Sequence, residues 1–70
     1  MIKNEFEHAV KWASVLLSNH PEINGRFYKE RADEYGLWAE VCWSAKAYYE
    51  SAPNLDINDA FTYGFNEWDI

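Results

Sequence analysis

Residues 26–51 read RFYKERADEYGLWAEVCWSAKAYYES, and this stretch decides how the whole chain is expected to fold. Its apolar residues recur at helical spacing from the first turn to the last. On a helical wheel of about 100° per residue they spread over roughly 200°, which is too wide an arc for a single neighbour. The stretch therefore predicts a central helix that packs between two others. The residues of the arc are Phe27, Tyr28, Ala32, Tyr35, Trp38, Ala39, Val41, Cys42, Trp43, Ala45 and Tyr49.

Two residues bear on the limits of this central helix. Pro53 disfavours helical geometry at Ala52, so the helix is expected to end at about Ser51. Gly36 lies in the middle, where a glycine lowers helix stability by about 1 kcal/mol relative to alanine. Because the apolar periodicity runs on across Gly36, the sequence leaves open whether the helix continues there, kinks, or breaks into two.

A shorter helix is expected on each side of the central one. The first covers about residues 4–19, with Asn4 as its N-cap and an apolar face at helical spacing. The second covers about residues 56–68, with Asp56 as its N-cap. No segment shows the sustained alternation of a strand. The predicted fold is all-α: one domain of residues 1–70, arranged as a three-helix bundle with a long central helix.

Composition excludes several functional classes. The 70 residues hold 12 acidic and six basic side chains, a formal net charge of -6 that repels nucleic-acid phosphates. No apolar run approaches the roughly 20 residues of a membrane span, and the start of the chain lacks the pattern of a secretory signal. The expectation is a cytoplasmic protein that binds neither nucleic acid nor membrane directly.

The sequence holds little catalytic or metal-binding chemistry. Glu5 and His8 have the Glu-x-x-His spacing of half a carboxylate-bridged metal site, but the second half is missing. Cys42 falls near the centre of the apolar arc, where a free cysteine behaves as a small hydrophobic residue. We therefore expect no cofactor, no metal and no enzymatic activity. A small enzyme or metal protein is kept as a third hypothesis.

Several residues that favour protein contacts are expected at the surface. Val15 lies nearly opposite the apolar stripe of the first helix, with Trp12 at the stripe's edge and His8 in the same line. Tyr63 is the corresponding outlier on the third helix. Arg31 falls among apolar residues, so it either stacks on a ring, pairs with an acid of this chain, or contacts an outside carboxylate. Because Trp, Tyr and Arg dominate binding hot spots, these five residues are predicted to bind a partner.

The order of charges along the central helix runs against its dipole. The helix begins with Arg26, Lys29 and Arg31 and ends with Glu50, whereas acids are favoured at the start of a helix and bases at its end. This order suggests that charge is placed for a partner. The acids expected to line an outer surface that engages a basic patch are Asp33, Glu40, Asp59, Glu67 and Asp69.

Two functions follow from these features. The leading hypothesis is a non-enzymatic protein–protein interaction module, a small acidic regulator or inhibitor that engages a basic surface of a nucleic-acid-handling protein. Small acidic proteins of phages and mobile elements are an analogy for this class. The alternative is a homodimer, because a helix of about 26 residues would be ~39 Å long and could pack antiparallel with a second copy. Arg26 and Lys29 of one chain would then face Glu40 and Glu50 of the other.

Overall fold

The protein's structure, a computed structural model, describes residues 2–52 and 56–70, with side chains from residue 5 onward. All regular structure in this part of the chain is helical, which confirms the all-α prediction. The described residues form four helices, which are α1 (Ile2–Ser18), α2 (Gly25–Asp33), α3 (Trp38–Ser51) and α4 (Ile57–Glu67).

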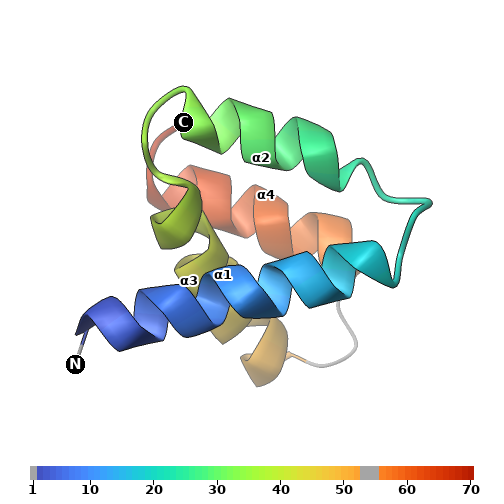
Figure 1. Cartoon of the computed structure of the whole chain (residues 1–70), viewed down its shortest axis with the longest axis horizontal. Coiled ribbons are helices and arrows are strands. Elements are labelled where there is room, and N and C mark those ends of the chain that lie inside the picture. The colour runs from blue at the N-terminus through green and yellow to red at the C-terminus, as the bar shows by residue number, and fades with distance from the viewer. Residues whose placement is uncertain (1, 53–55) are drawn as a thin grey trace.

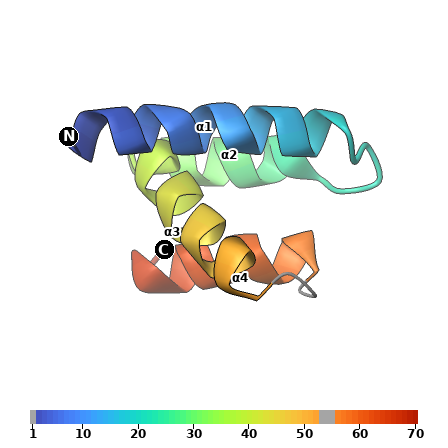
Figure 2. The same cartoon turned by 90° about the horizontal axis from the view of Figure 1, so that it is seen from below.

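The helices are arranged in two layers that α3 connects. In Figure 1, α1 and α2 lie at opposite edges of the molecule, with α4 between them and farther from the viewer. Figure 2 shows α1 and α2 in one layer, α4 in the other, and α3 running steeply between the two. Accordingly, α3 packs most extensively against α4 and α1. No helix in the described residues is both long and apolar enough to cross a membrane.

The chain breaks at Gly36, which is one of the possibilities that the sequence left open, and the three-helix bundle with a long central helix is not confirmed. Gly36 adopts the left-handed conformation, with φ 67°. The backbone N–H of Leu37 donates to the carbonyl of Ala32 at 3.0 Å, and that of Gly36 donates to the carbonyl of Asp33 at 3.0 Å. This pair of bonds is a Schellman motif, which ends a helix by satisfying its last carbonyls. Over residues 2–52 and 56–70 the chain therefore has four helices instead of the three that were expected.

The break also explains the wide apolar arc. Ala32 of α2 is buried, and Val41 and Cys42 of α3 are fully buried, so each helix contributes its own narrower face to the core. Phe27 and Tyr35, which the continuous wheel placed on the packed arc, are instead exposed. The breadth of the arc arose from two helices of different direction drawn on one wheel.

Dividing the helix removes only part of the opposition between the charge order and the helix dipoles, since Arg26 remains in the first turn of α2 and Glu50 in the last turn of α3. Arg31 lies in the last turn of α2 and Glu40 in the first turn of α3, and both positions are favourable. Arg26 is paired within α2, where its Nε lies 3.0 Å from Oε1 of Glu30. Glu50, the other charge that still opposes a dipole, is likewise paired within α3, with its Oε2 3.0 Å from Nζ of Lys46. The remaining mismatch is therefore offset by ion pairs inside the chain.

The outer helix limits agree with the sequence in part. The first helix begins at Ile2, so Asn4 lies inside it and is not its N-cap. Asp56 does cap α4, since its carboxylate accepts the backbone N–H of Asn58 at 2.9 Å. At the end of α3, Ala52 leaves the helical region, whereas Pro53, to which the sequence assigns this ending, lies outside the described residues.

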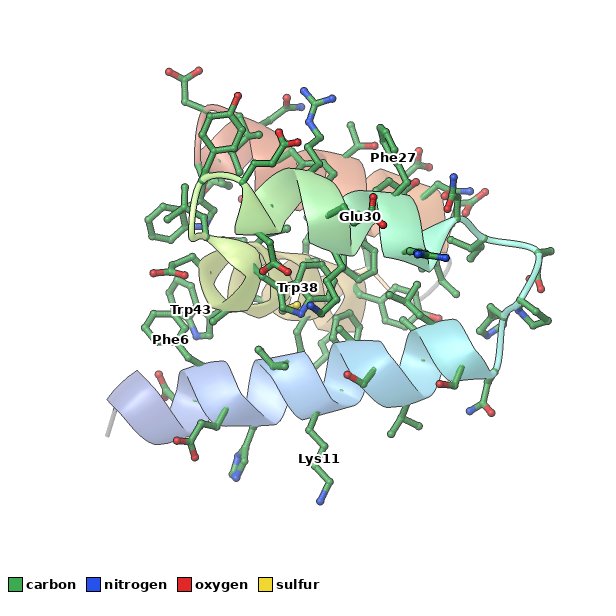
Figure 3. The ribbon with its side chains drawn as sticks, turned by 45° about the horizontal axis from the view of Figure 1, so that its top comes forward. Phe6, Lys11, Phe27, Glu30, Trp38 and Trp43 are labelled. Atoms are coloured by element: carbon green, nitrogen blue, oxygen red, sulfur yellow. The ribbon has the colours of Figure 1, made fainter. Side chains whose placement is uncertain are left out.

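Phe61 of α4 is the centre of the core. It is fully buried, and rings from the three other helices stack around it nearly parallel. The ring centroids of Trp12, Tyr28 and Trp38 lie 6.1, 5.3 and 6.0 Å from that of Phe61, with interplanar angles of 20°, 10° and 9°. Figure 3 shows Trp38 directed into the space between the helices. Four helices therefore meet at one aromatic ring.

Close contact between α3 and α4 depends on Gly64. A Cβ atom at this position would lie 2.8 Å from the carbonyl oxygen of Val41 and 3.1 Å from its Cγ1. Both distances are shorter than normal contacts, so a side chain here would push the two helices apart. Glycine lets the α4 backbone approach α3 while Phe61 and Phe65 remain buried.

We expect Gly36→Ala to lower the free energy of unfolding by about 1–2 kcal/mol, because an L side chain is strained at positive φ. A Cβ atom at Gly36 would have no neighbour within 4 Å, so steric contact does not confuse the result. Urea unfolding followed by circular dichroism measures the change. Gly36→Asn is the control, since asparagine tolerates this conformation and should lose less. Equal stability of the wild type and the alanine variant would contradict the assignment.

We expect Phe61→Leu to destabilise the protein by about 1–3 kcal/mol, because it removes the ring on which three others stack. Phe27→Leu is the matched control: the Phe27 ring is 50% exposed, and its replacement should change stability by about 0.5 kcal/mol or less. The measurement is again urea unfolding. If Phe27→Leu lowered the free energy of unfolding as much as Phe61→Leu, the stacking on Phe61 would not be a main source of stability.

Candidate functional site

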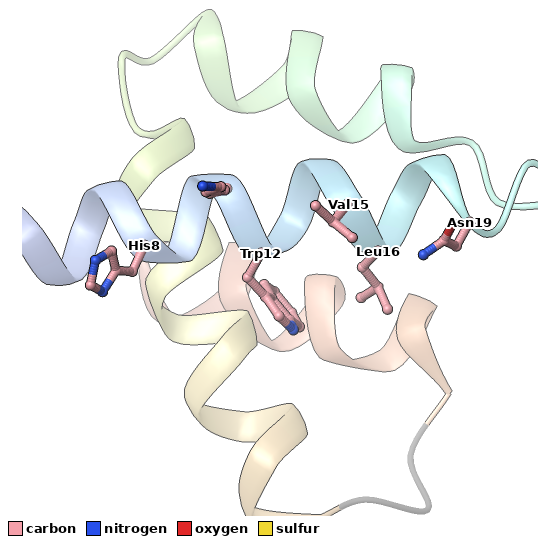
Figure 4. Close-up of a pocket in the computed structure, with 6 residues that line it drawn as sticks. His8, Trp12, Val15, Leu16 and Asn19 are labelled. Carbon is pink, nitrogen blue, oxygen red and sulfur yellow. The ribbon is translucent and has the colours of Figure 1, made fainter.

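A hollow on the outer face of α1 is the candidate site. It is shallow and wide open to solvent, with a volume of about 460 Å³. Figure 4 shows the labelled residues lining it, all of which project from α1. This hollow, called the α1 groove below, is lined by His8, Lys11, Trp12, Val15, Leu16 and Asn19. The structure thus brings together three predicted site residues, His8, Trp12 and Val15.

Trp12 is half-buried, in agreement with its predicted position at the edge of the apolar stripe. Besides stacking on Phe61, its ring lies with its centroid 6.0 Å from that of Tyr49 at the end of α3. Trp12 is therefore a core residue on one side and a wall of the groove on the other. Because the core holds the ring, the groove has a fixed aromatic wall before any ligand binds.

Val15 gives the groove its exposed apolar surface. Its side chain is 55% exposed, whereas Leu16 beside it is half-buried against the core. Lys11 lies at the margin and points away from the bundle in Figure 3. Sequence reasoning missed Lys11 and Leu16 as lining residues, although their wheel positions next to Trp12 and Val15 carry that signal.

The guanidinium group of Arg31 contacts residues of its own chain. Its guanidinium carbon lies 5.5 Å from the centroid of the Phe65 ring, and its Nη2 donates to the carbonyl of Ile70 at 3.4 Å. The sequence left open whether Arg31 stacks on a ring, pairs with an acid of this chain or contacts an outside carboxylate. The structure has it against a ring of its own chain. Arg31 therefore joins α2 to the end of α4 and lies away from the α1 groove.

The five acids predicted to form one surface are spread over three helices. Asp33 is paired, with its Oδ2 2.8 Å from Nζ of Lys29 on the same helix. Glu40 is half-buried in the first turn of α3, and Asp59 lies in the first turn of α4. Glu67 and Asp69 lie at the opposite end of α4, about 12 Å along the helix from Asp59. Within the described part of the chain, no three His, Cys, Asp or Glu side chains gather as metal ligands would.

A second hollow lies between α3 and α4 and holds Tyr63 and Glu67. It encloses about 310 Å³. Trp43, one of its lining residues, is 41% exposed, although the sequence placed it on the packed arc. A wheel for α3 alone, starting at Trp38, would have shown Trp43 about 140° from Trp38. This hollow, called the α3–α4 groove below, is lined by Trp43, Ser44, Ala47, Tyr48, Ser51, Tyr63 and Glu67.

Cys42 lies in neither groove. It is fully buried in α3, as the wheel predicted. Burial raises the pKa of its thiol far above the usual range, and the nearby charge of Asp33 raises the pKa further. The thiol is therefore protonated at neutral pH, whereas a nucleophilic cysteine acts as the thiolate.

Comparison of the chain with models of protein families, with characterised proteins and with solved structures gives no match in any of the three.

The buried thiol predicts a specific loss of stability in alkali. An ordinary thiol has a pKa of 9.0, so the unfolded chain ionises Cys42 above that pH while the folded chain does not. The raised pKa contributes stability that is fully present below pH 9.0 and is lost as the pH rises, by up to about 1.4 kcal/mol per pH unit. Cys42→Ala should remove this slope between about pH 9 and 10.

The measurement is urea unfolding of both proteins at several pH values in this interval. Tyr28 limits the upper end, because burial, followed by the charges of Asp56 and Asp59, raises its pKa above the ordinary 10.0. Its hydroxyl donates to Oδ1 of Asn58. Only the slope is compared, so a constant stability difference caused by the smaller alanine does not matter. Parallel curves for the two proteins would contradict the prediction.

Proposed function

We propose that this protein is a non-catalytic interaction module that binds a basic, amphipathic helix of another protein along the α1 groove. The observation that carries the proposal is Val15, 55% exposed inside an apolar hollow whose wall is the fixed ring of Trp12. The exposed Val15 side chain adjoins the aromatic ring of Trp12 and the half-buried Leu16 on one face of α1, and adjoining apolar residues of this kind can form the contact surface for a partner. A helix fits an open groove along another helix through residues at i, i+3, i+4 and i+7.

Trp12 has the properties of a binding hot spot. Tryptophan is enriched at such positions, which are well packed and surrounded by residues that exclude water. The stacking of Trp12 on Phe61 and its contact with Tyr49 order the ring in advance. Binding therefore loses little side-chain entropy at Trp12, which favours affinity.

The net charge of the whole chain favours a basic partner over a second copy, although among the described residues the α1 groove itself is lined by Lys11 and by no carboxylate. Each chain carries a formal charge of -6, so two copies repel each other, whereas a cationic helix is attracted from a distance. The long central helix on which the homodimer hypothesis depended is divided at Gly36, so its antiparallel packing has lost its basis. A cytoplasmic regulator or inhibitor that engages the basic surface of a nucleic-acid-handling protein matches this charge.

The test uses a synthetic peptide of about 18 residues, long enough to form a helix, with leucines on one face and lysines on the other. Isothermal titration calorimetry measures its binding to the wild type, to Val15→Asp and to Ser14→Asp. Val15→Asp should weaken binding about tenfold, which corresponds to the loss of about 1.4 kcal/mol of apolar contact. Because both variants gain a negative charge, attraction by charge alone would tighten binding in both.

Ser14→Asp is the matched control, since Ser14 is exposed on α1 and does not line the groove. It should bind the peptide within about twofold of the wild type. Equal affinities for the two aspartate variants would show that the peptide binds elsewhere. Equal binding of a peptide with glutamates in place of lysines would refute the charge argument. A dimer in sedimentation equilibrium that Val15→Asp dissociates would replace the basic helix with a second copy as the occupant.

A further inference from the structure

The α3–α4 groove has the chemistry of a site for a planar organic cation. Two of its lining residues carry exposed aromatic rings, Trp43 at 41% and Tyr63 at 37%. Glu67, one helical turn after Tyr63, adds a carboxylate to the same hollow. Its volume of about 310 Å³ is at the lower end of the roughly 300–1,000 Å³ of small-ligand pockets.

The rings of this groove are held in place by the fold. Tyr48 and Tyr63 stack on each other with ring centroids 4.1 Å apart and an interplanar angle of 11°. Phe6 meets Trp43 edge to face at 5.6 Å and 73°, and Figure 3 shows the two side chains together. The floor is also fixed, because the indole N–H of Trp68 donates to Oγ of Ser44 at 2.9 Å. Aromatic faces attract cations through their π electrons.

The local field in this groove is negative. Glu67 is the last residue of α4, and the carbonyl end of a helix favours a positive charge. Lys46, on the neighbouring turn of α3, is already paired, with its Nζ 3.0 Å from Oε2 of Glu50. Within residues 2–52 and 56–70, Glu67 belongs to none of the ion pairs, so its carboxylate is available to an outside cation.

We propose that the α3–α4 groove binds the guanidinium group of an arginine side chain. A guanidinium is flat, so it can lie against the exposed ring of Tyr63 or Trp43 while its N–H groups bond the Glu67 carboxylate. An ammonium group matches this arrangement less well, because it is a compact, strongly hydrated charge that cannot make paired parallel bonds. This inference goes beyond the proposed function, since the groove shares no residue with the α1 groove.

The test is an NMR titration of the ¹⁵N-labelled protein with N-acetyl-arginine methylamide. The indole N–H resonance of Trp43 is the readout, assigned from the Trp43→Phe variant. We expect a saturable shift with a dissociation constant in the millimolar range, as befits one side chain in an open groove. Glu67→Gln should weaken binding at least fivefold. Glu34→Gln, which removes the same charge at an exposed position after α2, should stay within twofold of the wild type.

The corresponding citrulline derivative has the shape of arginine without its charge, and it should cause no saturable shift. An equal shift by citrulline, or equal affinities for the two glutamine variants, would overturn the proposal. Equal affinity for the lysine derivative or tetramethylammonium would overturn the assignment to arginine. Val15→Asp should leave the arginine titration unchanged. The two proposals therefore fail separately: the peptide tests the α1 groove and the arginine derivative tests this one.

Discussion

The stacking of three rings on Phe61 is the constraint on which the rest of the structure depends. A 70-residue chain without a disulfide buries only about 60% of the surface exposed in its unfolded form, so each buried contact matters. Phe61 receives a ring from each of the other three helices, and the large area of those rings holds the two layers together. One wall of the α1 groove is the outer side of this arrangement, because Trp12 reaches both the core and the surface.

The sequence predicted the ends of the fold better than its middle. The Asp56 cap follows from a local rule, since a capping side chain acts within a few residues of the helix start. The break at Gly36 cannot be predicted from the spacing of apolar residues, because it depends on the backbone conformation that the glycine adopts. A glycine can stay helical or turn left-handed, and the choice depends on whether Leu37 gains more by returning to the core than by continuing the helix.

The same break determines which site residues the sequence could place correctly. Val15 and His8 share a face because of their positions within one uninterrupted helix, so the wheel placed them together correctly. The groove between α3 and α4 depends on the register of two helices, and the wheel drawn through Gly36 turned Trp43 inward. The stacking of Trp12 on Phe61 joins residues 49 positions apart, a contact that no local pattern predicts.

The steep course of α3 accounts for an apolar groove on so small a protein. A helix of 17 residues such as α1 is about 25 Å long, and a neighbour that crosses it steeply covers only part of that length. A parallel central helix would have covered more of Trp12 and Leu16, which are half-buried beside the core-facing side of α1. Val15, on the outer face, would be exposed in either arrangement. Because Gly36 divides the central helix and redirects α3 toward α4, the break leaves Trp12 and Leu16 partly open beside Val15, on the surface to which we assign the function.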